Sequence, residues 1–162
     1  NRRAYEEDLL KCDNKEYIYV SMDVNGLKTV NDTFGHEAGD ELIKGASNCM
    51  CKIFGSYGKV YRTGGDEFAA VLCDCGEKQE NISEAFHKEI KKWSGSIIKS
   101  LTISCGYVYK SEFPDMSVTE IAKIADRRMY EEKTCYYENY FSCRQRISEA
   151  PFFVDKKIRQ GI

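Results

Sequence analysis

The sequence has no excess of one charge and no long apolar run. Its 162 residues carry 24 basic and 26 acidic side chains, so the composition does not indicate a general nucleic-acid-binding protein. No apolar stretch approaches the roughly 18 residues of a membrane-spanning helix. The opening residues, NRRAYEEDLL, lack the apolar segment of a signal peptide. We therefore expect a cytoplasmic domain that binds no nucleic acid, has no membrane span within this chain and holds any anionic partner at a local site.

Imidazole side chains are scarce, which argues against a zinc centre. Histidine occurs only at His36 and His87. The eight cysteines include two C-x-C pairs but no C-x-x-C spacing of the kind found in zinc sites. We interpret the cysteines as reduced thiols of a cytosolic protein.

Hydrophobic periodicity predicts one α/β domain over residues 1–137, followed by a C-terminal tail of uncertain structure over residues 138–162. We expect helices over residues 2–11, 37–54, 79–94 and 117–133, and strands over residues 16–24, 59–62, 67–74 and 100–110. The segment between the first strand and the second helix is expected to be a loop. This order of elements, β-α-β-β-α-β, is typical of a ferredoxin-like antiparallel sheet with helices packed on it, a fold of the α+β type.

Two carboxylates are expected to meet at one edge of this sheet. In the usual strand order 4-1-3-2, Asp23 at the end of the first strand lies near the turn that holds Asp66. Two carboxylates this close raise one another's pKa, a cost that a divalent cation relieves. Simpler interpretations stay open, because Gly-Gly-Asp is also a good hairpin turn and Asp23 could merely end a strand.

The segment NGLKTVNDTFGHEAGD is rich in polar side chains and leads into a helix N-terminus. It contains Lys28, Asn31, His36 and Asp40, and helix starts and lysines are where phosphates bind. A phosphate loop of the G-x-x-x-x-G-K type is absent from the sequence. Asp40 could be only a favourable first-turn carboxylate, and His36 could only pack the loop.

Five segments in this order resemble the GGDEF family of diguanylate cyclases. They are NRRAYEE, DVNGLKTVNDTFGHEAGDELIKGA, YRTGGDEFAAVL, LTISCGY and IADRRMYEEK, which together span residues 1–133. The resemblance implies a palm-like nucleotidyl-cyclase fold that condenses two GTP molecules into cyclic di-GMP with release of pyrophosphate. It also implies Mg²⁺ or Mn²⁺ as cofactor and a second GGDEF domain, in a homodimer, as catalytic partner.

The resemblance assigns a role to each matching residue. Asp23 and Asp66 would bind the metal ions through their carboxylates, with the backbone carbonyl of Val24 helping. Glu67 would lie beside the metals as a catalytic carboxylate together with Asp66. The substrate-binding residues would be Lys28 and Lys133 at the β- and γ-phosphates, Asn31 and Asp40 at the guanine edge, and Gly64 and Gly65 where the hairpin backbone approaches the nucleotide.

The chain departs from the family pattern in four segments, one of which is Gly26-Leu27 in place of the commoner histidine-phenylalanine pair. Residues 23–25 read Asp-Val-Asn where many members have D-x-D, but the first aspartate is kept. Residues 136–138, Tyr-Tyr-Glu, replace the usual G-R-N, so the phosphate-binding arginine has no aligned partner unless Arg144 or Arg146 substitutes for it. Residues 55–58 lack the R-x-x-D through which many members are inhibited by their product.

These departures leave two alternatives to an active cyclase. One is a catalytically weak GTP-binding domain with a regulatory role, and the other is an interaction domain that keeps only the fold. The abrupt start at Asn1 is typical of an excised C-terminal output domain. We therefore expect a sensory or receiver domain before it in the full-length protein, which could itself be anchored in a membrane.

Overall fold

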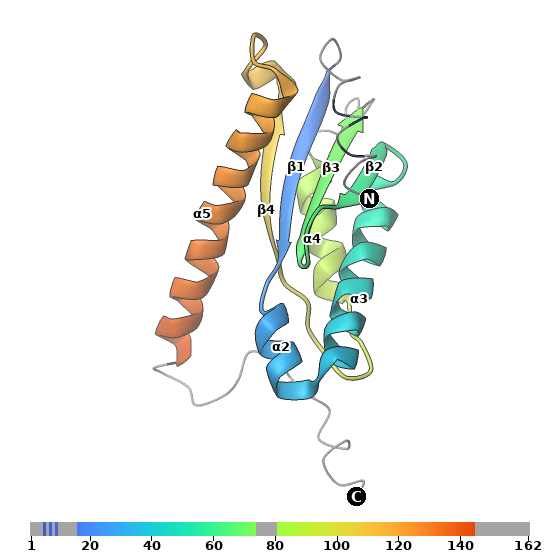
Figure 1. Cartoon of the computed structure of the whole chain (residues 1–162), viewed down its shortest axis with the longest axis vertical. Coiled ribbons are helices and arrows are strands. Elements are labelled where there is room, and N and C mark those ends of the chain that lie inside the picture. Colours follow the sequence, from blue (N-terminus) through green and yellow to red (C-terminus); the bar gives the residue numbers. More distant parts are fainter. Residues whose placement is uncertain (1–4, 6, 8, 10–15, 74–80, 145–162) are drawn as a thin grey trace, which may run out of the picture.

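The computed structural model describes residues 16–73 and 81–144, together with Tyr5, Glu7 and Leu9 (Figure 1). Its strands form one four-stranded antiparallel sheet in the order β2-β3-β1-β4. The strands are β1 (Tyr17–Val24), β2 (Gly58–Arg62), β3 (Glu67–Cys73) and β4 (Ile103–Tyr109). This is the predicted 4-1-3-2 order seen from the other edge, so the predicted fold class and strand order are confirmed.

The helices of the described part are α2 (Leu27–Phe34), α3 (His36–Phe54), α4 (Ile82–Lys92) and α5 (Val118–Arg144), with a short 3₁₀ turn η2 (Lys110–Glu112). The expected loop after β1 is wrong, because this segment forms helix α2. Val30 of α2 is fully buried, and Leu27 and Phe34 pack against the same core. Their spacing of three and four residues is helical, and core packing stabilises a helix only eight residues long.

Helix α5 is longer than the expected 117–133, since it continues to Arg144. Residues 134–144, TCYYENYFSCR, contain neither glycine nor proline, so no residue there ends the helix. The predicted tail beyond Arg144, including Arg146, lies outside the described residues. So does most of the predicted helix over residues 2–11.

The sheet separates two groups of core residues, and strand β1 belongs to both. Figure 1 shows α5 running along the β4 side of the sheet and α3 along the β2 side. The even-numbered residues of β1 pack with α3 and α4, against side chains such as Leu42, Phe54 and Phe86. Tyr17 and Tyr19 pack with α5, against Ile121 and Ala125. Because β1 is central and buried along its length, its two faces are both interior.

Side chains of α5 cover the outer edge of β4. Glu132 accepts a hydrogen bond from the backbone N–H of Cys105 at 2.6 Å, and Arg128 donates one to the backbone carbonyl of Tyr107 at 2.6 Å. Arg128 also forms an ion pair with Glu112 of η2 at 2.8 Å. These contacts satisfy backbone groups of an edge strand and fix α5 relative to the sheet.

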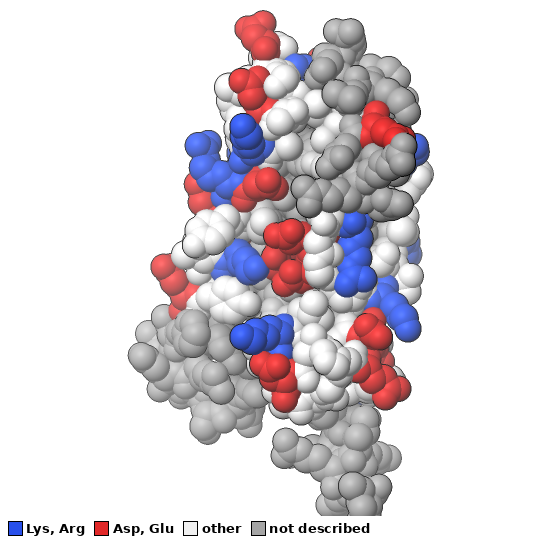
Figure 2. Space-filling view, in the orientation of Figure 1, with Lys and Arg blue, Asp and Glu red and all other residues white. Residues whose placement is uncertain are grey.

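The charged surface agrees with the balanced composition. Figure 2 shows Lys and Arg side chains interspersed with Asp and Glu on the visible face.

Within the part of the chain that the structure describes, no helix is both long and apolar enough to cross a membrane. Of the described cysteines, Cys49, Cys51, Cys105 and Cys135 are free thiols.

Candidate functional site

The end of β1 and the turn between β2 and β3 lie side by side. Asp23 is paired with Glu67 in the β1–β3 register. The backbone N–H of Val24 donates a hydrogen bond to the carbonyl oxygen of Asp66 at 2.9 Å. The structure therefore brings Asp23, Asp66 and Glu67 together at one edge of the sheet, as the strand order predicts.

The two glycines of the turn have different surroundings. A Cβ on Gly64 would lie 2.5 Å from a carboxylate oxygen of Glu67, whereas a Cβ on Gly65 would have nothing within 4 Å. The carbonyl oxygen of Gly65 accepts hydrogen bonds from the guanidinium of Arg62 at 2.6 and 3.2 Å. Gly64 thus makes room for Glu67 of its own chain, and Gly65 borders open space from which a ligand can approach.

Asp23 is a buried carboxylate with a cation on one oxygen only. Its residue is 3% exposed, and its Oδ2 lies 2.7 Å from the ammonium of Lys133 on α5. Its Oδ1 is buried without a hydrogen-bond partner among the described residues. Burial raises the pKa of Asp23, Lys133 opposes this rise, and the charges of Asp66 and Glu67 add to it.

These donors fit a divalent cation that arrives with a phosphate ligand. No cluster of three or more His, Cys, Asp or Glu placed to hold a metal occurs among the described residues, so a closed protein cage is not present there. Mg²⁺ is usually held by one or two carboxylates, with substrate phosphates and water completing its shell. Asp23 supplies an unpaired buried oxygen for this purpose, and Asp66 lies next to it.

The connection from β1 to α2 places a helix N-terminus directly after Asp23. Gly26 precedes the helix with φ of 77°, a left-handed conformation that glycine adopts without strain. Asn25 is buried, its amide oxygen accepts a hydrogen bond from the hydroxyl of Ser104 at 3.0 Å, and its backbone N–H donates to Thr102 at 3.0 Å. Lys28 is exposed in the first turn of α2, on the helix end that attracts anions.

The two residues expected at a guanine edge come from neighbouring helices. Asn31 lies on α2 and is half-buried, while Asp40 lies on α3 and is exposed. Asp40 is at the rim of a cavity of about 370 Å³ that Trp93 and Ile97 also line. Asn31 does not line this cavity, so the structure does not place the two side chains in one preformed pocket.

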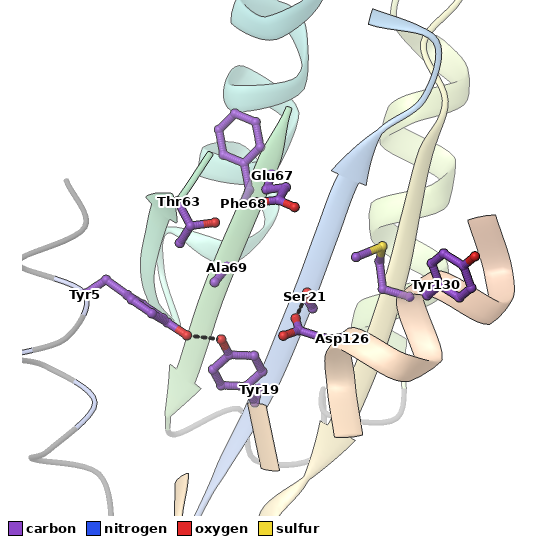
Figure 3. Close-up of a pocket in the computed structure, with 10 residues that line it drawn as sticks. Tyr5, Tyr19, Ser21, Thr63, Glu67, Phe68, Ala69, Asp126 and Tyr130 are labelled. Atoms are coloured by element: carbon purple, nitrogen blue, oxygen red, sulfur yellow. Dashed lines mark hydrogen bonds between the residues drawn. The ribbon is translucent and has the colours of Figure 1, made fainter. Parts of the chain in front are cut away.

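A second cavity, of about 480 Å³, lies between the sheet and α5 (Figure 3). Glu67 lies at one part of its lining, and the hydroxyls of Tyr5 and Tyr19 hydrogen-bond to each other at another. The hydroxyl of Ser21 donates a hydrogen bond to Asp126 of α5 at 2.5 Å. The cavity therefore lies on the face of the sheet that α5 covers, and the carboxylates of Glu67 and Asp126 line it.

Sequence reasoning missed Asp126, although a signal was present. Asp126 precedes Lys133 by seven residues, which is two helical turns, so both lie on the same face of α5. Both contact β1, at Ser21 and at Asp23.

The family's phosphate-binding arginine has no counterpart at its aligned position. That position is Tyr137, which lies within α5 with its ring packed edge-on against Tyr136 at 5.2 Å between centroids. Arg144, considered above as a substitute, is the last residue of α5.

Comparison with protein families gives one matching family over most of the chain. The family model described as diguanylate cyclase, GGDEF domain, matches residues 1–136. A probable diguanylate cyclase, DgcI of Escherichia coli K12, is 37% identical over 136 residues, which cover 82% of this chain and 29% of that protein. Diguanylate cyclase DgcN of the same organism is 30% identical over 144 residues, covering 82% of this chain and 35% of that protein. The chain therefore spans about a third of the length of these relatives.

Solved structures share the fold. The GGDEF domain of DgcB from Caulobacter crescentus, in complex with c-di-GMP, has a TM-score of 0.72 at 21% identity, covering 83% of this chain and 85% of that one. The diguanylate cyclase SiaD from Pseudomonas aeruginosa, in complex with its activator SiaC, has a TM-score of 0.73 at 23% identity. The match covers 83% of this chain and 55% of that one. At these identities the likeness establishes the arrangement of helices and strands.

Proposed function

The chain belongs to the GGDEF family of diguanylate cyclase domains, and from this membership we propose that it condenses two GTP molecules into cyclic di-GMP and releases pyrophosphate. The observation that carries the proposal is the meeting of Asp23, Asp66 and Glu67 with Lys133 at one edge of the sheet. Three carboxylates and an ammonium are the groups that a triphosphate with its divalent cation needs.

Two lysines would bind the β- and γ-phosphates. Lys133 now contacts Asp23, and its side chain is 28% exposed, so its ammonium can turn toward a phosphate that approaches from solvent. Lys28 is exposed at the start of α2, where the helix N-terminus adds its own attraction for anions. When Lys133 transfers to the phosphates, Asp23 is left with both oxygens free.

Asp23 and Asp66, with the backbone carbonyl of Val24, would hold the Mg²⁺ or Mn²⁺ ions. When bound, such ions neutralise phosphate charge and lower the pKa of the attacking 3′-hydroxyl. Glu67 faces the same side of the sheet as Asp23 and is exposed. In this proposal Glu67 accepts a hydrogen bond from the incoming hydroxyl and orients it.

Asn31 and Asp40 would select the base. Guanine presents donors at N1 and N2, which suit a carboxylate, and an amide can meet N3 or N2. Adenine lacks these donors, so a buried contact with Asp40 would leave the charge unpaired. We expect GTP to be preferred over ATP by on the order of 10²-fold.

The reaction requires a second copy of the domain. Each chain offers one Asp23–Asp66 site, but the product contains two nucleotides, each joined through its 3′-hydroxyl to the other's α-phosphate. Two domains must therefore face each other with reacting atoms about 3–3.5 Å apart. The partner that we propose is another GGDEF domain, in a homodimer.

One observation favours a second candidate, a GTP-binding regulatory domain with weak catalysis. Tyr137 occupies the position of the family's phosphate-binding arginine, and it is packed against Tyr136 within a continuous helix. A site without that arginine has one cation fewer for the transition state. Binding of GTP would survive this loss better than turnover.

Incubation with GTP and Mg²⁺, followed by chromatography for cyclic di-GMP, distinguishes the candidates. An active cyclase forms the product, Asp66→Asn does not, and ATP in place of GTP yields none. Saturable GTP binding by calorimetry without product would assign the regulatory function. Absence of both would leave only an interaction domain and would overturn the proposal.

A further inference from the structure

We propose that Gly39 is a specificity-positioning residue, which allows the amide of Asn31 to lie against helix α3 one residue from Asp40. The inference rests on the proposed selection of guanine by Asn31 and Asp40. It concerns a residue that contacts no base itself. Gly39 is buried in the first part of α3, at the contact between α2 and α3.

The space beside Gly39 is filled by Asn31. A Cβ at residue 39 would lie 1.9 Å from Oδ1 and 2.9 Å from Cγ of Asn31, and 3.2 Å from Cδ1 of Leu27. The first distance is more than 1 Å shorter than a Cβ contact can be. No residue other than glycine is therefore compatible with the present position of the Asn31 amide.

Backbone conformation does not explain this glycine. The glycines of the described chain with positive φ are Gly26 and Gly35, and Gly39 has an ordinary helical backbone. Glycine in a helix interior is less favourable than alanine. The close approach of Asn31 is what the missing side chain permits.

The amide of Asn31 is available to a ligand. Among the described residues its side chain has no hydrogen-bond partner, so packing against Gly39 rather than a polar contact holds it in place. Because Gly39 and Asp40 are consecutive, this packing also fixes the amide relative to the backbone of Asp40. Hydrogen bonds tolerate only a few tenths of an ångström in length, so a displacement of about 1 Å would remove the amide's bond to a base.

The phosphate side of the site does not depend on this contact. Asp23, Asp66 and Lys133 lie on β1, the β2–β3 turn and α5, and none of them touches the space that a Cβ at Gly39 would fill. Substitution of Gly39 should therefore lower affinity for the base and leave affinity for the triphosphate. That separation is not expected from a general loss of stability.

The test is calorimetric binding of GTP and ATP, with Mg²⁺, to the wild type and to Gly39→Ala, Asn31→Ala and the double variant. Gly39→Ala should weaken GTP binding about tenfold and leave ATP binding unchanged. Asn31→Ala should do the same, and the double variant should lose no more than Asn31→Ala alone. The matched control is Ala46→Gly, a change of the opposite kind two turns along α3, which should lower Tm and keep the ratio of GTP to ATP affinity.

Each outcome decides a separate point. Equal binding of GTP and ATP by the wild type would overturn both the guanine site and this inference. A wild type that prefers GTP, with Gly39→Ala equally selective, would overturn the inference alone. If Gly39→Ala does not fold, the Tm values of Asn31→Ala and of the double variant are compared. Similar values support a clash between the added Cβ and Asn31, and an unfolded double variant refutes it.

Discussion

The two faces of strand β1 differ in chemistry although both are buried. The even-numbered residues are apolar throughout and at most 1% exposed: Ile18, Val20, Met22 and Val24. The odd-numbered residues change along the strand from tyrosines to Ser21 and then Asp23. The even-numbered face thus packs in the core with α3 and α4 along its whole length. The odd-numbered face packs with α5 at the start of the strand and ends at the charged site of Asp23. We therefore expect that stability and chemistry can be altered separately at adjacent residues of this strand.

The largest effect is expected from removal of a carboxylate on the polar face. Asp66→Asn should lower the rate of cyclic di-GMP formation by about 10³-fold, because several kcal/mol, about 4, of transition-state stabilisation depend on the charged ligand. Product formation is measured by chromatography at saturating GTP and Mg²⁺. Near wild-type turnover by this variant would remove Asp66 from the site.

Asp23→Asn sharpens the contrast because it should reduce activity without reducing stability. Burial raises the pKa of Asp23 despite Lys133, so the folded protein disfavours the charged form relative to the unfolded chain. Because the pKa of Asp23 is higher in the folded protein than in the unfolded chain, ionisation of this carboxyl destabilises the folded state as pH rises above the unfolded pKa. The Tm of the variant at neutral pH should be equal to or higher than that of the wild type, and a clear fall would contradict the account.

The neighbouring residue on the apolar face should behave in the opposite way. Met22 is fully buried, and Met22→Ala should lower the free energy of unfolding by about 2–5 kcal/mol through lost burial and a cavity. Urea denaturation measures this loss, and activity per folded molecule at low temperature should stay near that of the wild type. Loss of activity without loss of stability would show that the two faces are not separable.

The architecture could be predicted from the sequence more completely than the side-chain contacts. Apolar, β-branched runs bounded by turn residues identified all four strands. The β-α-β-β-α-β order then predicted the arrangement that brings Asp23 close to Asp66. Helix α2 was missed because three apolar residues in an eight-residue segment form a helix only when the core packs on them. The pairing of Lys133 with Asp23 could not be predicted in the same way, because it depends on how α5 lies along β4. Tertiary contacts fix that position, among them the hydrogen bond from Arg128 to the backbone carbonyl of Tyr107.

A moderate effect is expected from dilution, because the polar edge must face a second copy. Activity per molecule should rise roughly in proportion to protein concentration until dimers dominate. A leucine zipper fused before Asn1 should raise activity at low concentration by increasing the effective concentration of the partner. Constant specific activity down to nanomolar protein, in a sample shown to be monomeric, would rule out the two-domain reaction for this chain.

The smallest effect concerns a contact between the helices of the two faces. His87 on α4 lies 3.7 Å from Glu132 on α5, and this partner raises the pKa of His87 above its ordinary value, against burial and the charge of Lys91. A raised folded pKa for histidine gives stabilisation that is complete below about pH 6.5 and disappears as pH rises through the folded pKa. His87→Gln should therefore lower Tm near pH 6 and have no effect near pH 9, and solvent screening keeps the contribution below about 0.5 kcal/mol. The same Tm difference at both pH values would mean that the contact is not ionic.

The central claim is that the end of the polar face holds a divalent cation together with GTP. The most direct measurement is electron paramagnetic resonance of Mn²⁺ titrated into the protein with a non-reacting GTP analogue, for the wild type, Asp23→Asn and Met22→Ala. The account predicts saturable Mn²⁺ binding in the wild type and in Met22→Ala, and its loss in Asp23→Asn although that variant is folded. Unchanged Mn²⁺ binding in Asp23→Asn would contradict it.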